Sequence, residues 1–244
     1  MTALDMLLFG VYPYICLTVF LLGSLIRFDR DQYTWKSDSS QLLKAGQLRV
    51  GSNLFHLGVL FLFFGHVFGM LTPHFLYESF ISAGDKQVMA MISGGTAGLL
   101  GIIGLSILMH RRLVEPRIYA TSKTSDIVIL LLLWLQVTLG LATIPLSAQH
   151  LDGSMMMRLA EWAQRIATFR PGGPELLAEA GWVFKTHMLL GMTIFLVFPF
   201  TRLVHVWSGF GLLAYLARPY QLVRSRRINL PAGHNQPAKP GAGA

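Results

Sequence analysis

The sequence contains a single cysteine, Cys16, and this scarcity excludes several kinds of site. One thiol cannot form a disulfide within the chain, supply the four thiolates of an iron–sulfur cluster, or attach a c-type haem through a C-x-x-C-H motif. Any cofactor that the chain carries must therefore be held by other side chains.

Charged residues are also scarce, at 13% of the chain, whereas 53% of the residues are hydrophobic. The apolar residues fall into long blocks, each able to cross about 30 Å of hydrocarbon at about 1.5 Å per helical residue. These features predict an all-α fold, a polytopic membrane bundle of five transmembrane helices, and not a barrel. The five blocks are residues 5–27, 51–71, 87–110, 126–147 and 182–209.

The placement of positive charge predicts the orientation of the bundle. The net charge is +8, and if residue 1 lies outside, the inner segments 28–50, 111–125 and 210–244 with Arg27 hold fourteen of the twenty Lys and Arg residues. This bias predicts an N-terminus outside and a C-terminus in the cytoplasm. The charge is explained by membrane topology and implies no nucleic-acid partner. The outer loops hold only Lys86, Arg158, Arg165 and Arg170.

The remaining segments predict one membrane domain, residues 1–227, followed by a tail. The first block opens "MTALDMLLFGVYPY" without a preceding Lys or Arg and without a cleavage site, so we expect a retained span and not a signal peptide. "SMMMRLAEWAQRIATF" has helical amphipathic spacing and predicts a short helix on the outer interface, ended by "RPGGP". The tail, residues 228–244, is rich in Pro, Gly and Ala and is expected to be disordered.

The third block carries glycines at every third position, Gly95, Gly98, Gly101 and Gly104. Small residues of this kind permit a tight contact between helices, which is their commoner use. A groove for a flat cofactor is the alternative, and the two uses are compatible.

Four histidines lie inside predicted spans, although an imidazole in hydrocarbon is costly without a strong partner. His56 and His66 lie on the second span, and His187 and His205 lie on the fifth, which runs the opposite way. Depth therefore pairs His66 with His187 at the outer side and His56 with His205 at the inner side. On an unbroken helix His187 and His205 would share one face, whereas His56 and His66 would be about 80° apart.

Two stacked pairs of neutral imidazoles are the axial ligands that two b-type haems require. Small neighbours of the histidines leave room for a macrocycle. The alternatives are histidines that only hydrogen-bond within the bundle, and a zinc or copper path, which usually recruits carboxylates or thiolates that these two spans lack. The small neighbours are Gly58, Gly65, Gly69 and Gly191.

Several cations lie near the ends of the spans. Arg202, three residues before His205, and Arg111 with Arg112 lie at the inner side, where they would bind haem propionates or reach lipid phosphates. Lys86 begins the third span at the outer side, level with His66, where an ammonium group would hydrogen-bond a quinone carbonyl or simply flank the span.

Several long motifs in register resemble the gamma subunit of membrane-bound respiratory nitrate reductase, a di-haem cytochrome b. The likeness covers roughly residues 1–227, and the stretch around "RPGGPELLAEA" and the tail depart from the family pattern without touching a proposed ligand. The motifs are "QYTWKSDSSQ", "NLFHLGVLFLFFGHVFGMLTPH", "TIPLSAQHLDGSMMMRLAEWAQ", "HMLLGMTIFLVFPFTRLVHVWS" and "YQLVRSR".

The resemblance implies a site and an activity. It implies that the outer haem is held by His66 and His187 and the inner haem by His56 and His205, and that quinol, menaquinol or ubiquinol, is oxidised at Lys86 and Gly65 beside His66. Electrons would pass to an iron–sulfur (beta) subunit and a molybdenum (alpha) subunit that reduces nitrate at the cytoplasmic face of the inner membrane. The alternatives are a cytochrome serving another cytoplasmic oxidoreductase and a purely structural membrane anchor.

Overall fold

The computed structural model describes residues 2–31 and 45–207, which belong to one compact unit, Met1–Ser208. Within these two ranges every regular element is a helix. The predictions made for residues 32–44 of the inner loop and for the tail, residues 228–244, lie outside the described residues.

Five helices in the described ranges are long and apolar enough to cross a membrane, which confirms the predicted all-α bundle of five spans. The first span joins α1 (Ala3–Met6), a π-helical turn η1 (Leu7–Val11) and α2 (Tyr12–Arg30). The others are α3 (Ala45–Leu71), α4 (Ala83–Val114), α6 (Thr124–Ser147) and α8 (Trp182–Val197).

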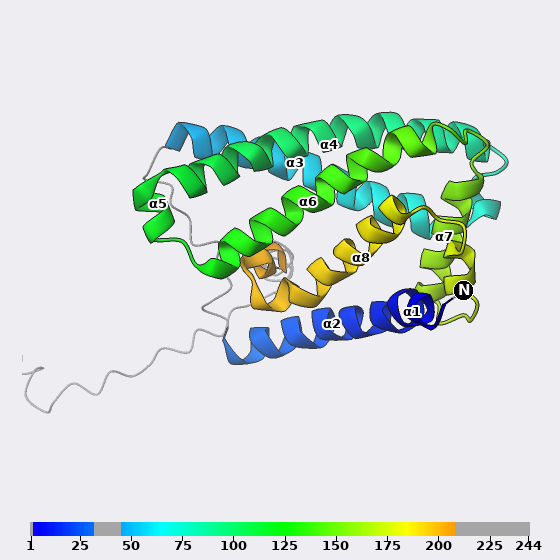
Figure 1. Ribbon diagram of the computed structural model, residues 1–244, viewed down its shortest axis with the longest axis horizontal. Coiled ribbons are helices and arrows are strands. Elements are labelled where there is room, and N and C mark those ends of the chain that lie inside the picture. Colours follow the sequence, from blue (N-terminus) through cyan, green and yellow to red (C-terminus); the bar gives the residue numbers. More distant parts are fainter. Residues whose placement is uncertain (1, 32–44, 208–244) are drawn as a thin grey trace, which may run out of the picture. The chain divides into compact units, whose positions relative to one another are not determined.

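Shorter helices connect the spans. They are η3 (His74–Leu76), α5 (Pro116–Ala120), α7 (Ser154–Ala167), η4 (Pro174–Leu177), η5 (Phe198–Phe200) and η6 (Arg202–Val204). Helix α7 confirms the predicted short amphipathic helix, and Figure 1 shows it near the N-terminal end of the first span. Its Trp162 indole donates to the Phe9 carbonyl at 3.0 Å, and its Gln164 amide donates to the Met70 carbonyl at 2.9 Å.

The spans pack in a row, with α3 against α4, α4 against α6, α6 against α8, and α8 against α2 (Figure 1). The glycines of α4 make two of these contacts close. A Cβ on Gly104 would lie 2.4 Å from the Phe55 nitrogen on α3, and one on Gly98 would lie 2.7 Å from Leu141 Cδ2 on α6. A spacing of three residues turns back by about 60° per step, so the stripe crosses from one face of α4 to another. This geometry supports the tight-contact interpretation.

The fifth span is interrupted inside the predicted apolar block 182–209. Pro199 lies in the short 3₁₀ turn η5, and Thr201 after it adopts an extended backbone with φ −117° and ψ 177°. Proline lacks the N–H that a continuing α-helix needs and clashes with the preceding turn. The expectation that His187 and His205 share one continuous helical face is therefore wrong.

Candidate functional site

The structure brings the four membrane histidines together in the two pairs predicted from depth. The ring centroids of His66 and His187 lie 6.2 Å apart, and those of His56 and His205 lie 6.3 Å apart. His56 and His66 lie on α3, whereas His187 lies on α8 and His205 follows the turn η6 beyond it. Helices α3 and α8 are separated in the packing row by α4 and α6. The rings thus meet between two helices that are not neighbours in that row.

Hydrogen bonds at Nδ1 define the chemical state of three of these rings. The distances from Nδ1 to a backbone carbonyl oxygen are 2.7 Å for His56 to Ser52, 2.7 Å for His66 to Leu62, and 2.6 Å for His205 to Arg202. A carbonyl oxygen only accepts, so Nδ1 carries the proton and the lone pair of a neutral ring lies on Nε2. None of these Nε2 atoms is hydrogen-bonded to a described residue, so each retains a lone pair suited to a metal.

His187 is held differently. Its Nδ1 atom is buried and has no hydrogen-bond partner among the described residues. Its ring lies against α6 at Gly140, where an added Cβ would be 3.1 Å from His187 Cε1. The sequence did not identify Gly140, because nothing in the spacing along α6 shows which residue faces a ring on α8.

The donor set can be tested against a haem iron. An imidazole nitrogen binds a metal at about 2 Å and the ring centre lies about 1 Å further away, so two rings on opposite sides of one ion have centres about 6 Å apart. Both pairs have this separation. No group of three or more His, Cys, Asp or Glu side chains in residues 2–31 and 45–207 is arranged to hold an ion. Paired imidazoles suit an iron whose other ligands come from a macrocycle, and the residues therefore fit haem.

The glycines near the histidines divide into two kinds. A Cβ on Gly65 or Gly69 would meet no atom within 4 Å, so the prediction that they leave room holds. Gly58 instead packs against α4, where its Cβ would be 2.5 Å from the Gly101 nitrogen. The prediction is wrong for Gly58 and for Gly191, whose Cβ would lie 3.0 Å from Nε2 of Gln136, because helix packing fills both positions.

Lys86 is a buried cation near the start of α4. The residue is 9% exposed, and its Nζ atom has no hydrogen-bond partner among the described residues. Nζ lies 3.5 Å from the centroid of the Tyr77 ring, whose face attracts a cation but occupies none of its N–H donors. Burial, and then the charge of Glu78, raise the pKa of Tyr77, so the phenol stays neutral. Tyr77 was not identified from the sequence, because it lies in the connection between two spans.

The register of α3 against α4 gives the height of Lys86 along the bundle relative to His66. Gly58 lies against Ala97 and Gly101, and Gly104 lies against Phe55, so the two helices are antiparallel. A helix rises about 1.5 Å per residue, so this register places Lys86 about 9 Å beyond His66 along the helix axis, opposite the end of α3. Lys86 is therefore at the same end of the bundle as His66, but not level with it as expected.

The predicted propionate partners lie at the other end of the bundle. The Arg112 guanidinium donates to Ser122 Oγ at 3.0 Å and to Asp126 Oδ2 at 3.1 Å, and this ion pair joins α4 to α6. Arg111 is 2% exposed, and Arg202 lies in η6, where its carbonyl accepts from His205. The propionate roles of Arg112 and Arg202 stay predictions.

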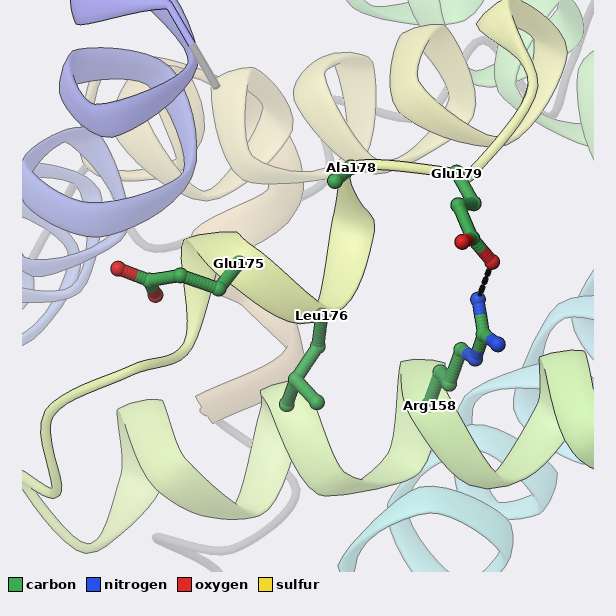
Figure 2. A pocket seen from close by; sticks show the side chains of 5 residues that line it. All are labelled: Arg158, Glu175, Leu176, Ala178 and Glu179. Carbon is green, nitrogen blue, oxygen red and sulfur yellow. Dashed lines mark hydrogen bonds and ion pairs between the residues drawn. The ribbon is translucent and has the colours of Figure 1, made fainter.

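A separate hollow lies beside α7 (Figure 2). It contains an exposed ion pair between Arg158 on α7 and Glu179. No histidine contributes to its lining, so this hollow is distinct from the paired imidazoles. The lining residues are Arg158, Glu175, Leu176, Ala178 and Glu179.

Comparison with known proteins supplies the family. The family model described as nitrate reductase gamma subunit matches residues 5–226. The chain is 54% identical to the respiratory nitrate reductase 2 gamma chain of Escherichia coli (strain K12) over 224 residues, 92% of this chain and 98% of that one. It is 51% identical to the respiratory nitrate reductase 1 gamma chain of the same strain over 226 residues, 93% and 100% of the two chains.

A more distant relative agrees. The nitrate reductase gamma chain of Bacillus subtilis (strain 168) is 40% identical over 221 residues, 90% of this chain and 98% of that one. These matches confirm the resemblance drawn from the motifs, and the five spans agree with it. The chain therefore belongs to the nitrate reductase gamma subunit family and is a membrane subunit of respiratory nitrate reductase.

Proposed function

We propose that this chain oxidises quinol at the outer side of the cytoplasmic membrane and delivers the electrons inward to an iron–sulfur (beta) subunit and a molybdenum (alpha) subunit that reduces nitrate. The excess of Lys and Arg in the inner segments supports an N-terminus outside and a C-terminus in the cytoplasm. The five spans support a second role, in which the chain anchors the assembly to the membrane.

The observation that carries this proposal is the pair of bis-imidazole sites. His66 and His187 would hold an outer haem b, and His56 and His205 an inner one. When bound, the haems would supply a one-electron relay across the membrane. The backbone bonds at Nδ1 fix the ring orientation and make the opposite nitrogen more basic, which strengthens it as a ligand.

At the outer end, Lys86 would bind the quinol. Its ammonium group is desolvated and keeps its donors available, so it would donate to a quinol oxygen and stabilise the negative charge that appears when that oxygen loses its proton. Gly65 leaves the surface beside His66 open to a planar ring.

The proposed direction of electron flow has an energetic consequence. Protons released outside and electrons moved inward separate charge, and a full crossing against the membrane potential does work of about 2.3 kcal/mol per 100 mV for each electron. The single cysteine of this chain cannot supply the four thiolates of an iron–sulfur cluster, so in this proposal the cluster belongs to a partner subunit.

The test is the visible and electron paramagnetic resonance (EPR) spectra of the purified complex, which should show two b-type haem signals. His66→Tyr and His187→Tyr should remove one signal, and His56→Tyr and His205→Tyr should remove the other. His110→Tyr is the control, because His110 is exposed at the inner end of α4 and should leave both signals intact. A folded complex without haem bands would support a structural anchor, and loss of the same signal from the His66 and His56 variants would refute the pairing.

A further inference from the structure

Helix α2 carries no proposed ligand, but its C-terminal end is bonded to the interruption in the fifth span. The Arg27 guanidinium donates from Nη1 to the Pro199 carbonyl at 2.6 Å and to the Thr201 carbonyl at 2.9 Å. One turn earlier, Gly23 allows close approach to the same place, since an added Cβ would lie 2.9 Å from Cγ of Pro199. The end of α2 therefore contacts the interruption through a cation and through a close backbone approach.

The interruption creates the need for such a donor. In a continuous α-helix the carbonyls of Pro199 and Thr201 would accept from the N–H groups four residues later. Here the backbone at Thr201 is extended, and the N–H of Leu203 donates to the Thr201 hydroxyl at 3.2 Å instead. A carbonyl without a donor is costly in a membrane. Arg27 satisfies both carbonyls and so stabilises the interrupted backbone.

The same interruption determines where His205 lies. His205 follows directly on the 3₁₀ turn η6, which Thr201 precedes, and its Nδ1 atom is bonded to the Arg202 carbonyl of that turn at 2.6 Å. Val204 beside it is fully buried. The ring is therefore fixed to the turn, and a displacement of Pro199 or Thr201 would move it relative to His56.

We propose that Arg27 is a positioning residue for His205, and that α2 thereby sets the geometry of the inner bis-histidine site. This inference rests on the inner haem of the proposed function. The alternative role for Arg27 is to bind lipid phosphates at the membrane interface. In that role a lysine would serve equally well. At two carbonyls the residues are not equivalent, because arginine presents a planar fork of donors whereas lysine is a point charge on a flexible stem.

The experiment compares four variants in the full complex. Arg27→Lys keeps the charge and removes the fork, and Arg27→Met removes both. Gly23→Ala pushes on Pro199 without changing any charge. Arg30→Met is the matched control, since it removes a cation from the last turn of the same helix at an exposed position.

The readouts are the EPR spectrum of the oxidised haems and a redox titration that follows each haem separately. We expect Arg27→Lys and Gly23→Ala to shift the g-values and midpoint potential of the inner haem, and Arg27→Met to lose its signal. The outer haem should be unchanged in all three, and Arg30→Met should match the unmodified complex. The same variants in a His66→Tyr background would show the inner signal alone.

Two results would overturn the inference. One is an unchanged inner haem in both Arg27→Lys and Gly23→Ala. The other is an equal change in both haems, which would indicate a general loss of structure. If Arg27→Met does not assemble, the other two variants decide. Absence of haem signals from the unmodified complex would instead reject the proposed function, and so the two failures are distinguishable.

Discussion

Replacement of Gly104 by alanine should force α3 away from α4 beside the inner histidine. The added Cβ would lie 2.4 Å from the Phe55 nitrogen and 2.7 Å from the Gly51 carbonyl oxygen, and backbone atoms cannot rotate aside as a side chain can. Ordinary contact begins at 3.4 Å, so the helices must separate by about 1 Å. Overpacking of this kind costs about 1–3 kcal/mol, and the better helix propensity of alanine returns about 1 kcal/mol at most.

Because His56 directly follows Phe55, we expect Gly104→Ala to lower both the unfolding temperature and the content of the inner haem. Gly94→Ala, on the same helix, is the matched control: its Cβ would meet no atom within 4 Å, so it should be neutral or slightly stabilising. Thermal unfolding of the purified complex in detergent and haem content per polypeptide measure the two effects. Identical behaviour of the two variants would show that close approach at Gly104 is not required.

Substitutions at three further residues test other contacts. Lys86→Ala should impair quinol oxidation and leave both haem spectra unchanged, and normal steady-state kinetics would remove Lys86 from the quinol site. Tyr77→Phe should retain near-normal kinetics because it keeps the aromatic face, whereas Tyr77→Leu should raise the KM for quinol severalfold; equal kinetics in the two variants would argue against the cation–π contact. Asp126→Asn should weaken the bond to Arg112, lower stability by about 1–3 kcal/mol in thermal unfolding and spare the outer haem; an unchanged unfolding temperature would contradict this.

The sequence predicted the number, type and approximate limits of the spans, because hydrocarbon thickness constrains length and composition together. The first four spans begin before their apolar blocks, which composition could not show. Helix α4 begins at Ala83 and not at residue 87, because the Ser82 side chain accepts from the Asp85 N–H and caps a polar first turn. A membrane helix thus ends where its backbone is capped, and not where its hydrophobicity ends.

The histidine pairing was predictable because depth depends only on span order and direction. The face on which each ring lies was not predictable, since the interruption at Thr201 involves Arg27, which is 174 residues away in the sequence. Gly140 and Tyr77 were missed for the same reason: their contacts with His187 and Lys86 depend on how separate helices pack and connect. Neither contact leaves a periodic pattern in one segment.

Three of the four imidazoles are bonded to main-chain carbonyls of their own segment, and this arrangement bears on which substitutions the chain can tolerate. A carbonyl is present whatever amino acid occupies the position, so exchanges at residues 52, 62 and 202 leave the partner of each ring in place. Where the hydrogen-bond partner of a metal-binding histidine is a side chain, mutation of that side chain changes the affinity for the metal. A substitution at those three positions therefore leaves the bond behind each ring unchanged. His187 is the exception, because its Nδ1 atom has no hydrogen-bond partner among the described residues.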